Sequence, residues 1–112
     1  MANLKLANFG DLVKKEREKR GWTQTDLGAK IGINSSAISR IENNSKQLSA
    51  SKLSTISQLF EIDISKIKEL YYGDKFAREA YKNDCPETAF AVAEETVKYL
   101  KNKNTKQSRI NF

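Results

Sequence analysis

Histidine is absent from this sequence of 112 residues, which also contains one cysteine and one proline. Without histidine, metal-dependent hydrolysis and catalytic triads that use an imidazole have no natural residues to work with. The sequence has no glycine-rich phosphate-binding loop either. Cys85 cannot form a disulfide within the chain, so we expect a plain reduced thiol. These absences predict a protein that is not an enzyme and that holds no metal and no cofactor.

Long apolar runs are also missing from the sequence. No stretch reaches the length of a transmembrane helix, and residues 1–6 lack the apolar run of a signal peptide. We therefore expect a cytoplasmic protein with no membrane partner. Positive charge, by contrast, is abundant, because 20 Lys and Arg against 14 Asp and Glu give a net charge of +6 and a pI of about 9.5. This balance favours a polyanionic partner.

The hydrophobic pattern predicts an all-helical protein without internal repeats. At 112 residues the chain supports one compact domain with an appended element, and not two full domains. We expect the first five helices at about 9–20, 23–31 and 34–42, from a cap at Ser49 to Phe60, and from Ile64 to Tyr71.

The second and third of these helices are short, amphipathic and joined by a tight turn. Thr23, followed three residues later by Asp26, is typical of a capped helix start. Leu27 and Ile31 supply the buried stripe of that helix. Gly32 stands where the helix must end in a left-handed conformation. The pattern is typical of a helix-turn-helix that contacts DNA.

The helix over 34–42 has an unusual exposed face. Asn34 is its predicted cap, and Ile38 and Ile41 are predicted to face inward. A helix that only had to be soluble would more often carry Glu and Lys on its other positions. Here those positions hold short hydroxyls and one planar donor group, which suit a surface that approaches base edges closely: Ser35, Ser36, Ser39 and Arg40.

The last third of the sequence predicts a helical hairpin beyond a boundary at Gly73–Asp74. A short helix over about 76–81 is followed by a turn in which Asp84 caps the next helix, over about 86–102. Such a hairpin buries little alone, so it must pack on the first domain, on a second copy or on another protein. Its longer helix has an apolar stripe formed by Ala89, Phe90, Ala93, Val97 and Leu100.

The chain resembles the lambda-repressor-like (Cro/phage-repressor) helix-turn-helix family. The motifs that resemble the family extend over roughly sixty residues, and they include the helices before and after the turn. The resemblance implies an all-α fold with a five-helix DNA-binding domain over 1–73, which the predicted C-terminal helical hairpin over 74–103 follows. The residues over 104–112 are basic and polar without a period, so we expect a disordered basic tail there. The matching residues are Phe9–Gly10, Arg17, Gly21–Gln24, Asp26–Leu27, Ile31–Gly32, Ile38–Asn43, Leu53, Ile56, Phe60, Ile62 and Ile67.

The same resemblance implies structural roles for residues outside the exposed face. Arg17 and Glu42 match positions that form an ion pair tying the first helix to the end of the third. Gly28 replaces the usual Ala and should let two helices approach closely. Two positions depart from the family pattern. Glu16 stands where many relatives have an apolar residue, and Leu12 stands where many have a polar one. Leu12 is therefore expected to be covered by Leu4 and Leu6 or by the C-terminal hairpin.

The candidate DNA-binding residues follow from the exposed face and from the resemblance. Gln24 matches a family position that contacts phosphate and braces the third helix, although a solvated residue at a helix start is the alternative. Ala37 and Ser39 could shape the fit around a thymine methyl or a phosphate. The full set is Gln24, Thr25, Ser35, Ser36, Ala37, Ser39, Arg40, Asn43, Asn44 and Lys46.

Each of these residues also has a structural explanation. Serine is common near helix starts, so Ser35 and Ser36 could be there for the helix alone. Arg40 can contact a guanine through two hydrogen bonds or can contact a phosphate, which would add affinity but little specificity. The residues after the helix also make a good turn. Trp22 is expected to fill the core rather than to stack on a base.

The function that these observations favour is sequence-specific regulation of transcription. We expect a bacterial or phage repressor that binds double-stranded operator DNA as a homodimer through the helix at 34–42. Restriction-modification controllers use this same domain. The alternative is an antitoxin-like or adaptor protein whose hairpin at 74–103 binds a partner protein. A neighbouring toxin gene would favour that alternative, and a neighbouring methyltransferase or endonuclease gene would favour the controller.

Overall fold

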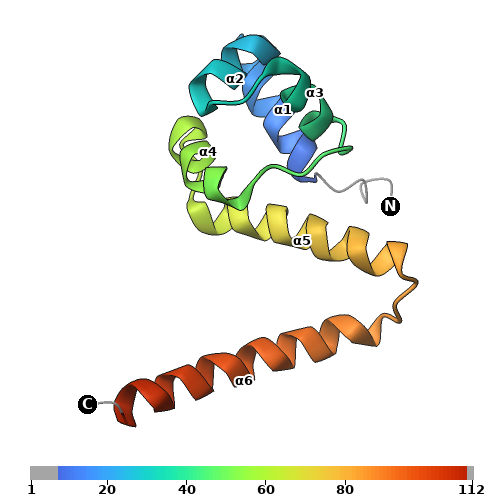
Figure 1. The fold of residues 1–112 in the computed structure, drawn as a ribbon, viewed down its shortest axis with the longest axis vertical. Helices are drawn as coiled ribbons and strands as arrows, with labels where there is room; N and C mark the ends of the chain where they lie inside the picture. Colours follow the sequence, from blue (N-terminus) through green and yellow to red (C-terminus); the bar gives the residue numbers. More distant parts are fainter. Residues whose placement is uncertain (1–7, 111–112) are drawn as a thin grey trace. The chain divides into compact units, whose positions relative to one another are not determined.

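The computed structural model describes residues 8–110, with side chains up to Lys103, and this part of the chain is helical without strands. It divides into two compact units, residues 1–77 and 78–112. The helices are labelled in Figure 1: α1 (Phe9–Lys19), α2 (Gln24–Ile31), α3 (Ser35–Glu42), the 3-10 turn η2 (Ala50–Lys52), α4 (Leu53–Phe60), α5 (Ile64–Lys82) and α6 (Thr88–Ile110). None of the described helices is long and apolar enough to cross a membrane.

Local capping explains why α2 and α3 begin and end where they do. Thr23 accepts a hydrogen bond from the Asp26 amide, and the Asp26 carboxylate accepts one from the Thr23 amide, which completes the predicted capping box. Gly32 ends α2 at φ 77°, a left-handed conformation that glycine adopts without a steric cost. The Asn34 side chain then accepts from the Ala37 amide at 2.8 Å. The predicted turn between the two helices is confirmed.

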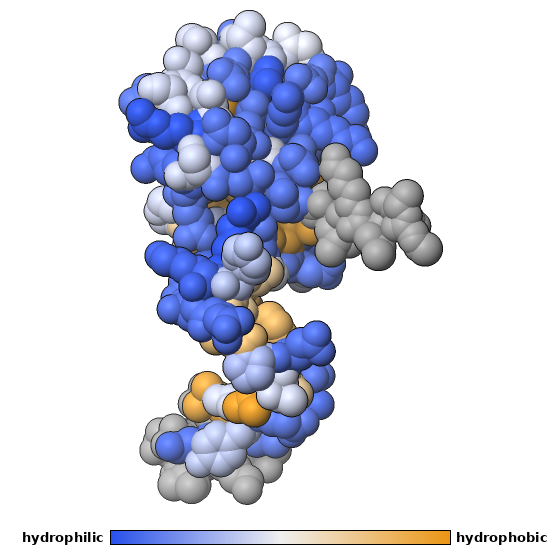
Figure 2. Space-filling view, turned by 90° about the vertical axis from the view of Figure 1, so that its right-hand side faces the viewer, coloured by the Kyte–Doolittle hydropathy of each residue, from blue (hydrophilic) through white to orange (hydrophobic). Residues whose placement is uncertain are grey.

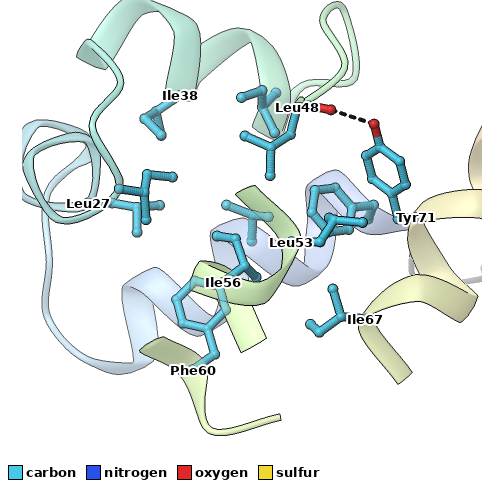
Figure 3. Close-up of a cluster of buried hydrophobic side chains, with 12 residues drawn as sticks. Leu27, Ile38, Leu48, Leu53, Ile56, Phe60, Ile67 and Tyr71 are labelled. Atoms are coloured by element: carbon cyan, nitrogen blue, oxygen red, sulfur yellow. Dashed lines mark hydrogen bonds between the residues drawn. The ribbon is translucent and has the colours of Figure 1, made fainter. Parts of the chain in front are cut away.

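One apolar cluster holds the first unit together (Figure 3). Tyr71 on α5 donates a hydrogen bond from its hydroxyl to the Leu48 carbonyl, which fastens the segment after α3 to α5. Burial raises the pKa of the Tyr71 hydroxyl. The buried members come from α1 to α5 and the segment before η2: Phe9, Val13, Leu27, Ile31, Ile38, Ile41, Leu48, Leu53, Ile56, Phe60, Ile67 and Tyr71.

The two unusual residues of α1 are both accommodated in the first unit. Glu16 is buried, and its carboxylate lies 2.7 Å from the Arg20 guanidinium, which also donates to the Phe60 carbonyl at 2.9 Å. Burial raises the pKa of Glu16, but hydrogen bonds from Arg20 and Lys19 outweigh it, so the pKa is lowered overall. Leu12 is half-buried against the core. The expected covers Leu4 and Leu6 lie outside the described residues.

Helix α5 is longer than the sequence pattern predicts. It continues through Gly73 to Lys82, so the predicted end at Tyr71 and the separate helix over 76–81 are wrong. One central glycine costs a helix only about 1 kcal/mol relative to alanine, which the good helix formers around it can offset. The compact units divide after Ala77, inside α5.

The turn between α5 and α6 and the end of α6 also differ from expectation. Asp84 stands at φ 52°, and its amide donates to the Tyr81 carbonyl, so Asp84 ends α5 instead of capping α6. Helix α6 continues to Ile110, which contradicts the disordered tail predicted from residue 104 onward as far as residue 110. Ser49 stands at the N-cap position of η2, which leads into α4, but its side chain makes no capping hydrogen bond; its hydroxyl lies 3.0 Å from that of Ser51.

Gly28 is the point at which α2 and the turn before α3 come closest. A Cβ atom added at Gly28 would lie 2.2 Å from the Ile33 carbonyl oxygen, far inside van der Waals contact. The three atoms nearest to this Cβ are all backbone atoms of Ile33 and Asn34, so no flexible side chain could move away. The close approach predicted from the sequence is therefore confirmed, and it sets the distance between the two helices of the motif.

We expect Gly28→Ala to lower the free energy of unfolding by about 1–3 kcal/mol, because the new methyl group must push the backbone apart. Gly73→Ala is the matched control, since no described atom lies within 4 Å of a Cβ added there. That control should raise stability by about 0.5–1 kcal/mol, as alanine is the better helix former. Denaturant unfolding followed by circular dichroism measures both. Equal effects of the two substitutions would contradict the close approach.

Candidate nucleic-acid interface

Helix α3 has two sharply different faces. Ala37, Ile38, Ile41 and Glu42 are buried, and α3 packs through them on the rest of the first unit. The opposite face carries most of the predicted DNA-binding residues of this helix: Ser35, Ser36 and Arg40 are exposed, and Ser39 is half-buried.

Ala37 lies on the other face of α3 from the remaining predicted residues of this helix. It is 7% exposed, and its amide donates to the Asn34 side chain. The reason is helical geometry, because position 37 lies beside Ile38 and one turn before Ile41, on the inward side of α3. Ala37 therefore supports the core of the motif and does not lie on the exposed face.

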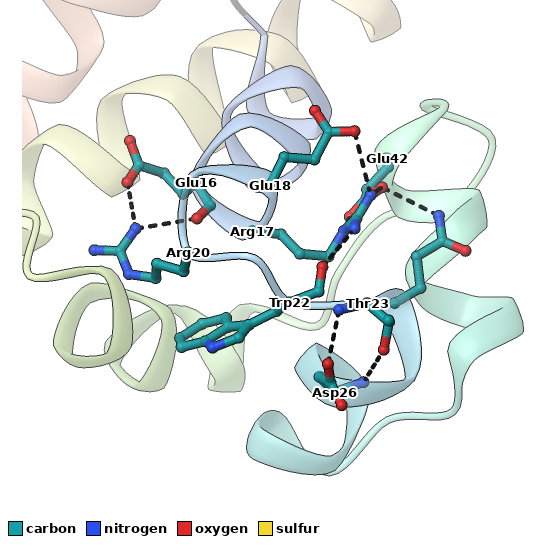
Figure 4. Close-up of polar contacts among 9 residues, drawn as sticks. Glu16, Arg17, Glu18, Arg20, Trp22, Thr23, Asp26 and Glu42 are labelled. Atoms are coloured by element: carbon teal, nitrogen blue, oxygen red, sulfur yellow. Dashed lines mark hydrogen bonds and ion pairs between the residues drawn. The ribbon is translucent and has the colours of Figure 1, made fainter.

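The C-terminal end of α3 is joined to α1 by a buried ion pair between Glu42 and Arg17 (Figure 4). The Arg17 Nε atom donates to Glu42 Oε2 at 2.7 Å, and Arg17 Nη2 donates to Glu42 Oε1 at 3.0 Å. The third donor, Nη1, reaches the Trp22 carbonyl at 2.8 Å. Hydrogen bonds to Glu42 raise the pKa of the Arg17 guanidinium, against the effect of burial. The ion pair implied by the resemblance is confirmed, and it joins α1, the turn before α2, and α3.

Gln24 adds α2 to the same cluster. As the first residue of α2 it is half-buried, and its side-chain Nε2 donates to Glu42 Oε1 at 3.2 Å. The predicted bracing of α3 by Gln24 is therefore present, whereas its phosphate contact stays a prediction. Thr25, the next candidate, is exposed at the start of α2.

The turn after α3 positions the remaining candidates. The Asn43 side-chain oxygen accepts hydrogen bonds from the Ser45 amide at 3.2 Å and the Ser45 hydroxyl at 2.8 Å. Asn44 stands at φ 68°, a left-handed conformation that asparagine tolerates, and is half-buried. Lys46 is exposed. Asn43 and Asn44 thus shape the turn, and Lys46 remains available at its surface.

Trp22 contributes one contact that carried no clear signal in the sequence and one that was predicted. The Trp22 carbonyl is a backbone acceptor, and its hydrogen bond to Arg17 depends on the turn and not on the identity of residue 22. The Trp22 ring packs against Phe60 with centroids 6.4 Å apart, and Lys30 Nζ lies 4.6 Å from its centroid. The predicted packing role of Trp22 is confirmed.

Residues 13–67, just under half of the chain, match the model of the helix-turn-helix family. This part of the chain has a helix-turn-helix fold. Helices α2 and α3 are the two helices of the motif, and α1, α4 and the start of α5 support them.

Curated relatives of the helix-turn-helix chain include the antitoxin HipB of Escherichia coli O6:H1 (strain CFT073). It is 40% identical over 60 residues, which are 54% of this chain and 61% of HipB. HipB of Escherichia coli strain K12 is 38% identical over 60 residues, 54% of this chain and 65% of HipB. The chain thus spans slightly less than two thirds of the length of these curated relatives.

Solved structures with a similar fold include the P22 c2 repressor in complex with a synthetic operator. Its TM-score is 0.52 at 23% identity, over 62% of this chain and all (100%) of that one. PlcR of Bacillus thuringiensis, solved in complex with the peptide PapR7 and DNA, has a TM-score of 0.50 at 25% identity. That similarity covers 96% of this chain and 37% of PlcR. At 23% identity, the similarity to the P22 c2 repressor shows a shared fold and nothing more.

We expect Arg17→Met to lower the free energy of unfolding by about 3–5 kcal/mol, because it leaves the buried Glu42 carboxylate without its main partner. The double variant Arg17→Met/Glu42→Met should lose less than the sum of the two single variants. Denaturant unfolding of the four proteins in a double-mutant cycle measures the coupling.

The control for this cycle is Lys66→Met, which removes one partner of an exposed pair. Lys66 Nζ lies 3.1 Å from Glu69 Oε2, with both side chains more than half exposed. Its loss should cost less than about 1 kcal/mol. An Arg17→Met effect as small as that of Lys66→Met would contradict the central place given to the buried pair.

Proposed function

We propose that the protein is a sequence-specific transcription regulator, a repressor, that places α3 in the major groove of operator DNA. The observation that carries the proposal is that α3 has two different faces. The inner face is buried, and the outer face carries small hydroxyl side chains and one guanidinium. Small side chains let a helix approach base edges, and the buried pair at its inner end keeps the helix from shifting. Repression rests on the resemblance to phage repressors. Action on operator DNA would require a cytoplasmic location.

Arg40 is the proposed base-contacting residue of α3. It is exposed, and its side chain offers the one planar group on this face that can donate two parallel hydrogen bonds to a guanine. Ser35 and Ser36, in the first turn of α3, can donate to or accept from several base edges. Half-buried Ser39 lies next to Arg40 and would limit how deeply α3 enters the groove.

The proposed phosphate contacts flank this face. Gln24 and Thr25 begin α2, where free backbone amides favour an anion. Because Gln24 already donates to Glu42, one end of its side chain is oriented by the same cluster that holds α3. On the other side, Lys46 and the turn of Asn43 and Asn44 follow α3 directly. Contacts of this kind add affinity and set the register of the protein on DNA.

A homodimer is the proposed binding form. One recognition helix covers only a few base pairs, so two copies related by a two-fold axis would contact two half-sites about 10 base pairs apart, or a multiple of that. The net charge of +6 supports binding to the polyanionic duplex.

A second candidate function is that of an antitoxin-like or adaptor protein. The observation that favours it is the 40% identity over 60 residues to a protein named antitoxin HipB. In that case the chain would bind a partner protein through residues 74–103, and DNA binding would accompany that role. A neighbouring toxin gene would favour this candidate, whereas a methyltransferase or endonuclease gene beside it would favour a restriction-modification controller.

Substitution of Arg40 and of Gln24 should separate base recognition from phosphate contact. Arg40→Ala should cost about 1–3 kcal/mol on the cognate site and should remove discrimination at one base position per half-site. Gln24→Ala should weaken binding to all sequences by a similar factor. Titrations against the operator and its single-base variants, at one fixed salt concentration, measure both effects.

Lys68→Ala is the control for loss of charge, because Lys68 is an exposed cation on α5. It should leave discrimination unchanged. If Arg40→Ala weakens every single-base variant equally, Arg40 contacts a phosphate, and base recognition belongs to the serines of α3.

Selection of bound sequences from a random DNA pool should return a two-fold symmetric site. Its half-sites should lie about 10 base pairs apart, or a multiple of that, because the recognition helices of a two-fold dimer meet the same groove on one side of the duplex. A single asymmetric site of a few base pairs would argue against the homodimer, and no enrichment at all would argue against sequence-specific binding.

A further inference from the structure

Helix α6 carries an apolar stripe that the second unit leaves at the surface. Phe90, Val97 and Leu100 are each about half exposed, at 49%, 49% and 50%. With Ala93 between them they recur at spacings of three, four and three residues, which is the pattern that pairs helices along a seam. Figure 2 shows apolar residues reaching the surface in its lower part, where α6 lies. Such a stripe needs a partner helix.

Charge along this segment is divided between its two halves. Residues 87–95 contain three glutamates and no cation, whereas residues 98–109 contain five Lys and Arg and no carboxylate. The helix dipole alone would favour this order weakly, within the first and last turns. The division extends over the whole helix, however, and gives α6 one acidic and one basic half.

We propose that the stripe on α6 is a self-association surface, on which α6 of a second copy packs in the antiparallel direction. The proposal rests on the proposed function in so far as a two-fold dimer binds the operator. Antiparallel packing sets the acidic half of each helix against the basic half of the other. Parallel packing would set like charges side by side, and like charges facing each other are destabilising.

The stripe also fits an antiparallel pair in its spacing. A midpoint near Glu95 sets Phe90 against Leu100 of the second copy and Ala93 against Val97 of the second copy, so the large side chains meet at the ends and a small one lies near the middle. At that middle, Lys98 Nζ lies 3.7 Å from Glu94 and 3.8 Å from Glu95, so the central carboxylates are compensated within their own helix. Glu87 meets the basic end of the second copy.

Another face of α6 supplies a matched control. Val92 and Tyr99 are 63% and 62% exposed, but at 100° per residue they point more than a quarter turn away from the centre of the stripe. In sedimentation equilibrium of the full chain at tens of micromolar, the wild type should be a dimer. Val97→Asp should weaken its association at least tenfold, and Val92→Asp should leave it within about twofold. A monomeric wild type, or an equal loss in both variants, would overturn the proposal, as would a monomeric wild type that binds another protein in a tight complex that Val97→Asp abolishes.

Disulfide trapping tests the antiparallel direction separately. In a Cys85→Ser background, Phe90→Cys and Leu100→Cys chains of different mass are mixed and oxidised. The antiparallel pair predicts that the mixed disulfide forms at least tenfold faster than either self-disulfide. Faster self-disulfides would show parallel packing and overturn the proposal. Circular dichroism of each variant confirms that α6 remains helical.

DNA binding by Val97→Asp distinguishes this proposal from the proposed function. The variant should bind a single half-site as well as the wild type does, and should lose at least tenfold in affinity for the full operator. If the wild type dimerises through α6 but binds no DNA sequence preferentially, the proposed function fails while the α6 pair stands.

Discussion

The buried pair between Arg17 and Glu42 is the interaction on which the geometry of the DNA-binding domain depends. Two hydrogen bonds in one plane leave little freedom for rotation, so the end of α3 is held at one angle to α1. The remaining donor of Arg17 holds the Trp22 carbonyl, and Gln24 reaches the same carboxylate from α2. A buried pair of this kind adds little net stability, but it makes one arrangement of the three helices much better than the others.

Close backbone contacts reinforce the same arrangement. A Cβ atom added at Gly10, on α1, would lie 2.5 Å from the Ile41 carbonyl oxygen. The backbones of α1 and of the end of α3 are therefore too close for any side chain at this position. The same holds at Gly28, between α2 and the turn before α3. The segment after α3 is then fastened to α5 by Tyr71 and Leu48. Side-chain charge, backbone contact and apolar burial thus all act on α3, the helix proposed to meet DNA.

Features with local causes could be predicted from the sequence, and features without them could not. The capping box at Thr23, the left-handed Gly32 and Asn44, and the buried stripes each depend on residues within one or two turns. The ends of α5 and α6 depend on small differences in helix propensity summed over many polar residues, so Gly73 and the basic end of the chain misled the prediction. At the site, the inward position of Ala37 follows from the predicted inward positions of Ile38 and Ile41, because Ala37 lies one turn before Ile41.

The separation of the two faces of α3 also bears on how such a protein can change its target. The outward side chains of Ser35, Ser36 and Arg40 are exposed, whereas the contacts that hold the helix run through Glu42 and the buried isoleucines. Exposed substitutions away from caps and the core usually alter stability by less than about 0.5 kcal/mol. For the proposed function, this separation means that new operator preferences can evolve in few steps with the fold left intact, because the residues proposed to contact the DNA sequence are not those that keep the domain folded.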